Sequence, residues 1–83
     1  MLLSCIPTQF IYDAENNTAD NNELVNPAQI TSMVKEKIIL SETGGVTTYL
    51  YHLKMRTADG GTVIWRYNSE VDRDADYNRI LVA

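Results

Sequence analysis

The sequence predicts an α+β fold: an antiparallel β-sheet of four to five strands arranged as a meander, with one C-terminal α-helix packed on one face. Residues 46–57 and 62–67 alternate apolar and polar side chains with a period of two, which is typical of strands with one buried face. The segment Ser69-Glu70-Val71-Asp72 approximates a capping box, and acidic residues crowd the turns that follow it. We therefore expect a helix from about Ser69 to Ile80. At 83 residues, the chain is expected to be one domain, 1–83.

The two alternating segments are joined by residues 58–61, Ala-Asp-Gly-Gly, which suit a tight turn. Their apolar rows share one face only if odd-numbered residues pair with odd-numbered ones. A loop of three residues, 59–61, satisfies this condition and sets Met55 opposite Trp65. Gly61 then takes the left-handed conformation of a bulged turn.

The rest of the chain is assigned in order. Pro7 lacks an N–H group and so belongs at a sheet edge or a bulge. The polar stretch 13–23 is expected to be a mobile surface loop. The expected elements are a strand at 2–12, a short return strand at 24–25, a helical turn at 26–29, a strand at 30–40, and a loop at 41–45 that ends in two glycines.

The face assignments of the strand 30–40 determine the expected core. Alternation sends one set of side chains towards the core: Ile30, Val34, Ile38 and Leu40. The other set shares the polar face: Met33, Lys35, Lys37 and Ile39. Trp65, Tyr67, Tyr49 and Leu53 form the apolar row beneath the helix, and Val71 faces that row. A stacking platform for single-stranded nucleic acid is the alternative interpretation of these aromatic residues.

The segment from Leu24-Val25-Asn26 through Ile30 and Met33, followed by two strands around a glycine turn and an acidic helix, resembles the flagellar FlbD-like proteins. It is also similar to many small phage and bacterial proteins of the same plan. The resemblance covers roughly residues 24–80. It implies a small sheet-plus-helix architecture without catalytic activity. The 13–23 and 41–45 loops depart from the compact family pattern.

The cysteine content and the hydropathy of the chain indicate the cellular compartment in which it is expected. Cys5 is the only cysteine, so no intramolecular disulfide is possible, and no apolar run reaches the roughly 20 residues of a membrane span. We expect a cytoplasmic protein in which Cys5 is a buried structural residue. Residues 1–5 also resemble the end of a lipoprotein signal, but without its basic and long apolar regions.

No constellation of residues indicates catalysis or a cofactor. His52 is the only histidine and has no second metal ligand nearby in the sequence. The acidic run 72–76 matches the start of a calcium loop, but Tyr77 replaces its glycine and Ala83 its final glutamate. We therefore expect no enzymatic activity, no metal and no cofactor.

Charge is unevenly spread along the chain, whose net charge is −4. Five of the seven Lys and Arg residues lie between residues 30 and 67. If the registers above hold, a basic face with apolar interruptions forms opposite the helix. Its expected members are Lys35, Lys37, Leu50, His52, Lys54, Arg56, Ile64 and Arg66.

Such a mixed face favours binding to an acidic protein partner, in a regulatory or accessory role. Two alternatives remain open. One is weak nucleic-acid binding through the same face. The other is self-assembly, as in a homodimer, because a thin sheet with one helix can leave apolar surface uncovered. A solvated outer sheet face explains the lysines and arginines without any partner.

Overall fold

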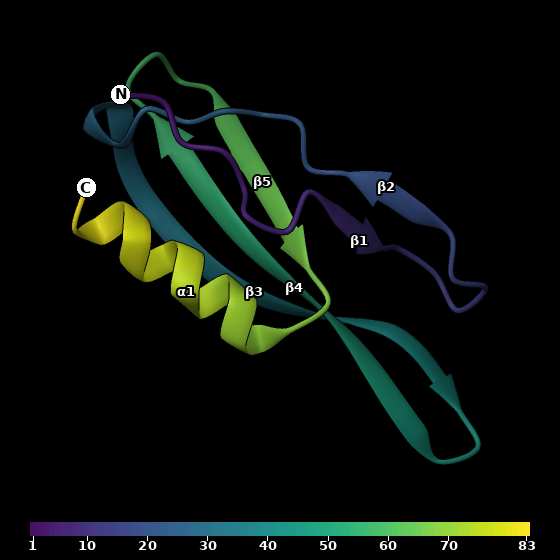
Figure 1. The fold of residues 1–83 in the computed structure, drawn as a ribbon. Helices are drawn as coiled ribbons and strands as arrows, with labels where there is room; N and C mark the ends of the chain where they lie inside the picture. The colour runs from purple at the N-terminus through teal and green to yellow at the C-terminus, as the bar shows by residue number, and fades with distance from the viewer.

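A long β-hairpin runs through the centre of the structure, a computed structural model that describes residues 1–83 (Figure 1). Its strands join a third one in a sheet of order β3-β4-β5, and helix α1 crosses one face of this sheet. A second, two-stranded sheet lies beyond β5. The elements are β1 (Gln9–Ile11), β2 (Thr18–Asp20), the 3-10 turn η1 (Pro27–Gln29), β3 (Ile30–Thr43), β4 (Val46–Thr57), β5 (Thr62–Tyr67) and α1 (Glu70–Leu81).

The α+β class and the C-terminal helix are confirmed, and β3, β4 and β5 follow one another as a meander. The single sheet of four to five strands is not found, because the five strands divide between two antiparallel sheets. The expected strand 2–12 is regular only over Gln9–Ile11, and Leu3 makes an isolated bridge with Val25. Pro7 lies between these two paired regions, and it lacks the N–H that a ladder needs.

The β4–β5 turn has the expected length but lies one residue earlier in the chain. The Thr57 N–H donates to the Gly61 carbonyl (3.0 Å), so the loop is 58–60, and Gly60 takes the left-handed φ of 88°. The expected pairing of Met55 with Trp65 is therefore wrong, because Met55 lies opposite Val63. A shift of two residues leaves each side chain on its face, so the apolar rows still meet.

The core lies between this sheet, the helix and the N-terminal segment. Trp65, Tyr67, Leu53 and Met55 are fully buried. They pack with Cys5, Val25, Val63 and Ile80 in one cluster. The interpretation of the aromatic row as core is confirmed for Trp65 and Tyr67, which leave no exposed ring face for a stacked base. The burial of Cys5 is also as expected.

Helix α1 docks through a partly polar face. Its buried residues are Arg73, Asp76 and Ile80, whereas Val71 is 77% exposed. The expectation that Val71 faces the sheet is therefore wrong. The physical reason lies in Arg73, which lies over the ring of Tyr51 (5.3 Å to the centroid) and donates to a β3 carbonyl (3.0 Å). These contacts turn the helix so that the Val71 side points to solvent.

The carboxylate of Asp76 joins the three parts of the molecule. It is 1% exposed and accepts hydrogen bonds from Tyr67 Oη of the sheet (2.7 Å), from the Ile6 N–H (3.2 Å) and from Cys5 Sγ (3.6 Å). Its other oxygen accepts from Arg79 Nε and Nη2 (3.1 and 2.9 Å). A buried carboxylate is tolerated only with such partners, and here they fix the N-terminal segment against the helix.

Asparagine side chains attach the N-terminal segment to the free edge of β5. The Asn21 amide donates to the Arg66 carbonyl (2.8 Å) and accepts from the Arg66 N–H (3.0 Å). The Asn68 amide makes the same kind of paired contact with Ile11. The stretch 13–23 was expected to be a surface loop throughout, but it contains β2 and the buried Asn21.

No helix in the structure combines the length and the apolar character that crossing a membrane would need.

Candidate functional site

The strand pairing divides the expected basic face between the two sides of the sheet. Lys35 lies opposite Leu53 and Lys37 opposite Tyr51, so both lysines are on the helix side. The prediction that they share a face with Lys54 is therefore wrong. The side chains of β3 that were expected in the core, Val34 and Ile38, lie on the other side instead.

Contacts with the helix and the aromatic row explain why β3 takes this orientation. Lys35 Nζ lies 3.1 Å from a carboxylate oxygen of Asp74 and 4.4 Å from the centroid of the Tyr77 ring. Lys37 Nζ lies 4.0 Å from the centroid of the Tyr49 ring. The hydrogen bond from Lys35 lowers the pKa of Asp74. An ammonium group over the face of an aromatic ring is attracted to it, so these rings and Asp74 make the helix side favourable for both lysines.

The side of the sheet away from α1 is here called the open face. Its members, from β3, β4 and β5 in turn, are Ser32, Val34, Glu36, Ile38, His52, Lys54, Arg56, Thr62 and Ile64. Val34 is 50% exposed and Ile38 41%, and Arg56 on the same face is also exposed. Basic, acidic and apolar side chains are thus interspersed on this surface.

Two of the expected face residues are less accessible than the sequence indicates. Leu50 is only 8% exposed, so the expectation that it lies exposed on the basic face is wrong. Arg66 is half-buried, and its guanidinium lies 5.7 Å from the centroid of the Phe10 ring, on the β1–β2 hairpin. This hairpin therefore bounds the open face at its Arg66 end.

His52 lies between Glu36 and Arg66 in neighbouring strands. Burial, and then the Arg66 guanidinium, lower the pKa of His52, and Glu36 opposes the shift. Its Nε2 atom is buried without a hydrogen-bond partner. The imidazole is therefore favoured in its neutral form, and no nucleophile or acid within hydrogen-bonding distance completes a catalytic pair.

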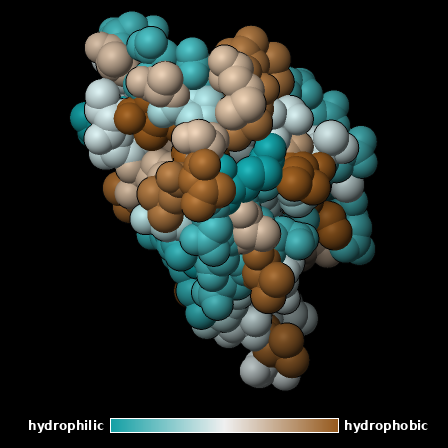
Figure 2. All heavy atoms as spheres, turned by 60° about the vertical axis from the view of Figure 1, so that its left-hand side comes forward, coloured by the Kyte–Doolittle hydropathy of each residue, from teal (hydrophilic) through white to brown (hydrophobic).

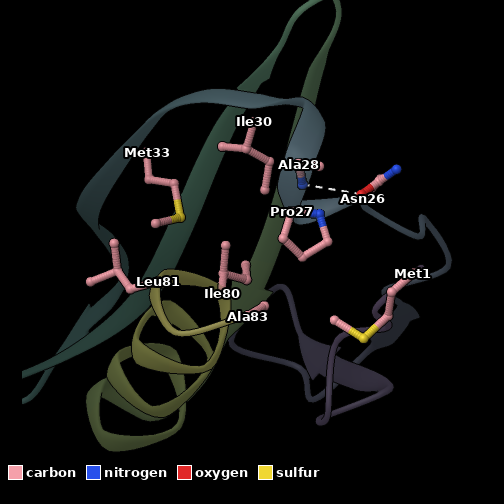
Figure 3. A pocket seen from close by; sticks show the side chains of 9 residues that line it. All are labelled: Met1, Asn26, Pro27, Ala28, Ile30, Met33, Ile80, Leu81 and Ala83. Carbon is pink, nitrogen blue, oxygen red and sulfur yellow. Dashed lines mark hydrogen bonds between the residues drawn. The ribbon is translucent and has the colours of Figure 1, made fainter.

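An apolar cleft of about 390 Å³ opens at the other end of the molecule, between η1, the start of β3 and the end of α1. Figure 3 shows the side chains of Ile30, Met33, Ile80 and Leu81 turned towards one another across it. Its lining is completed by Met1, Asn26, Pro27, Ala28 and Ala83. None of these side chains titrates, so the cleft offers apolar contact but no reactive group.

The acidic run of α1 does not form a shared cation site. The carboxylate oxygens of Asp76 accept the hydrogen bonds described above, and the carboxylate of Asp74 forms an ion pair with Lys35. No three His, Cys, Asp or Glu side chains of the chain are arranged so that they could hold a metal ion.

The sequence did not predict two features that shape this surface: Arg73 and Asp76 as buried docking residues, and the outward orientation of Val34 and Ile38 on β3. A signal for the first was present. Arg73, Asp76 and Ile80 recur at helical spacing of three and four residues, so they form one stripe. The charges of Arg73 and Asp76, however, predict a solvent-facing position.

Comparisons with protein-family models, with curated proteins and with solved structures each found no match. The resemblance to FlbD-like proteins therefore stays a prediction.

Proposed function

We propose that this chain is a non-enzymatic interaction module that binds an acidic protein partner on the open face. The observation that carries the proposal is the composition of that face. Lys54 lies between Val34 and Ile64 of the neighbouring strands, and Arg56 and Ile38 lie on the same side of the sheet, which no helix of the chain covers. Apolar contact area with a charged surround is typical of protein interfaces.

The same composition makes nucleic-acid binding the weaker alternative. Lys35 and Lys37 lie on the helix side, and Glu36 stands among the remaining basic residues. The net charge of −4 also repels a polyanion at long range. An accessory or regulatory role in the cytoplasm accords with the free, buried Cys5 thiol.

The first experiment reverses the charge of the open face with Lys54→Glu and Arg56→Glu in one variant. The matched control is Lys35→Glu with Lys37→Glu, which makes the same charge change on the helix side. A partner captured from the native host by the immobilised chain is titrated against wild type and both variants, at low and moderate salt.

We expect the open-face variant to lose roughly tenfold or more in affinity, mostly through slower association, because complementary fields steer the encounter. The control should change affinity by less than about threefold. Both variants should remain folded, since Lys54 and Arg56 make no ion pair and the loss of the partly exposed Lys35–Asp74 pair should cost the control only about 1 kcal/mol. Equal affinities for wild type and a folded open-face variant would show that the partner binds elsewhere.

Nucleic-acid binding gives a different result in the same titration. Each phosphate contact releases counterions, so the logarithm of the affinity for DNA or RNA would fall steeply and linearly with the logarithm of the salt concentration. A salt-sensitive complex with a nucleic acid and none with protein would replace the proposed function by that alternative.

A further inference from the structure

Strand β3 forms an outer edge of the central sheet. The strand order is β3-β4-β5, so no strand of the chain lies on its far side. Its pairing with β4 is regular from Ser32 to Ile39, between two register shifts. Figure 1 shows β3 as the outermost strand, on the side where α1 lies, and Figure 2 brings this side forward. Apolar patches are interspersed there with hydrophilic surface.

The strand pairing shows which backbone groups of this edge are free. In an antiparallel strand, successive residues direct their N–H and C=O groups to opposite sides. The Thr57 N–H bonds to β5, so the odd residues of β4 face β5 and its even residues face β3. Even residues of β4 lie opposite even residues of β3 throughout the regular stretch. The N–H and C=O groups of Met33, Lys35 and Lys37 therefore point outward, where the chain has no strand to meet them.

Helix α1 packs over β3 without taking up these outward groups. Arg73 donates to the Glu36 carbonyl (3.0 Å), and Glu36 is an even residue whose backbone faces β4. The contacts of the helix with Lys35 involve its side chain alone, which meets Asp74 and the ring of Tyr77. The edge is therefore covered on one face but open along its side, as a sheet edge that accepts an added strand must be.

A hollow of about 260 Å³ lies at the start of this edge, between β3 and α1. Its lining is mostly apolar: Ile30, Thr31, Ser32, Met33, Tyr77 and Leu81. Met33 and Leu81 also line the apolar cleft described above, and Figure 3 shows their side chains turned towards each other. An aliphatic side chain beside Met33 would fill this hollow and remove apolar surface from water.

The lysines of β3 favour an acidic occupant. Lys35 and Lys37 follow Met33 on the helix side of the strand. Lys35 is paired with Asp74, whereas Lys37 forms no ion pair. Lysines on an edge discourage pairing with most strands, but opposite charges directly across a strand pair attract. A second copy of the chain, paired antiparallel about Lys35 or Glu36, would instead set like charges opposite each other.

We propose that the stretch Met33–Lys37 binds an extended segment of a partner protein as an added antiparallel strand, with an aliphatic side chain opposite Met33 and an acidic one opposite Lys37. The outward backbone groups then supply affinity, and the hollow and the lysine supply specificity. This inference does not depend on the proposed function, because these side chains lie on the other side of the sheet from the open face and the occupant is a different ligand.

A synthetic peptide, acetyl-Ser-Glu-Thr-Thr-Val-Leu-Thr-amide, is the probe. Antiparallel pairing places its Glu opposite Lys37 and its Leu opposite Met33. The whole chain is followed by NMR with up to about 2 mM peptide, at which a site of millimolar affinity is more than half occupied. We expect the amide protons of Met33, Lys35 and Lys37 to gain protection from exchange. The amide protons of Val34 and Glu36, which already bond to β4, should keep theirs.

Methylation of single peptide nitrogens tests the strand pairing. N-methylation of the second threonine, opposite Lys35, removes a donor directed at β3 and should abolish binding. N-methylation of the first threonine, opposite Glu36, is the matched control, because that N–H points away from β3, and it should leave binding unchanged. Equal effects of the two methylations would overturn the proposed pairing.

Charge exchange tests the role of Lys37. Lys37→Glu should weaken binding of the peptide by roughly fivefold or more, and a peptide with Lys in place of Glu should then bind this variant more tightly than it binds the wild type. Lys54→Glu, the same change on the open face, is the matched control and should bind like the wild type. Unchanged exchange of the three amides at the highest peptide concentration, or protection that grows with the concentration of the chain alone, would overturn the proposal.

Discussion

Replacing Asp76 by asparagine tests whether the buried carboxylate holds the N-terminal segment, the sheet and the helix together. The substitution keeps the size of the side chain but replaces one oxygen by an NH₂ group. Both oxygens of Asp76 accept hydrogen bonds: Tyr67, Ile6 and Cys5 donate to one, and Arg79 donates to the other. Either orientation of the amide therefore brings a donor against a donor.

The expected loss follows from these contacts. Leaving a buried donor unsatisfied costs about 1–3 kcal/mol. Breaking a buried ion pair costs about 3–5 kcal/mol, but the Arg79 side chain is 29% exposed and can regain water, so the lower end applies. We expect Asp76→Asn to lower the free energy of unfolding by about 2–4 kcal/mol. A domain of this length has roughly 4–12 kcal/mol in total, so the loss is a large fraction.

Urea unfolding, followed by the fluorescence of the buried Trp65, measures this loss. The matched control is Asp72→Asn, four residues earlier on the same helix, where the side chain is exposed and makes no ion pair. It should cost less than about 1 kcal/mol. A loss below about 1 kcal/mol for Asp76→Asn would refute the reasoning, because the carboxylate would then contribute no more than a surface group.

The remaining predictions concern the helix and Cys5. Val71→Asp should change the free energy of unfolding by less than about 0.5 kcal/mol, because Val71 is 77% exposed, whereas Ile80→Asp should cost more than about 2 kcal/mol; equal losses in urea unfolding would contradict the helix orientation. The Cys5 thiol should react with a thiol reagent on the order of 100-fold more slowly in the folded than in the unfolded chain, and rapid labelling without denaturant would contradict its burial. Burial raises the pKa of Cys5 from its ordinary value of 9.0 to about 12, so the folded state holds its proton where the unfolded state releases it. Stability should therefore fall as pH rises above about 9, by at most about 1.4 kcal/mol per pH unit, and Cys5→Ala should reduce that slope in denaturation measured between about pH 8 and pH 10.

Local signals in the sequence predict most of the secondary structure. The glycines at 44–45 and 60–61, the alternation of 46–57, and Ser69 as N-cap each act within a few residues of the feature that they determine. The β4–β5 register shows the limit of such signals. Loops at 58–60 and at 59–61 both keep odd residues opposite odd ones, so the alternation does not distinguish them.

The division into two sheets depended on contacts that the sequence does not display. Asn21 and Asn68 bind backbone groups 45 and 57 residues away, respectively, and thereby replace a continuous ladder along β5. Asparagine in a polar stretch is typical of loops, and nothing local distinguishes an amide that pairs with a distant strand from one in water. The stretch 13–23 was therefore interpreted as a loop alone.

Of the predictions that were wrong, the orientation of β3 has the greatest consequence for function. Its residues alternate between an aliphatic set and a set containing two lysines, and patterning assigns the aliphatic set to the core. The structure reverses this assignment for Val34 and Ile38, because Asp74 and the rings of Tyr77 and Tyr49 make the helix side a good environment for lysine. Ile30 packs against the core, as expected. The reversal removes two positive charges from the open face and adds Val34 and Ile38 to it. The face keeps the mixed character that the sequence predicts, but it carries less positive charge and more apolar surface than expected.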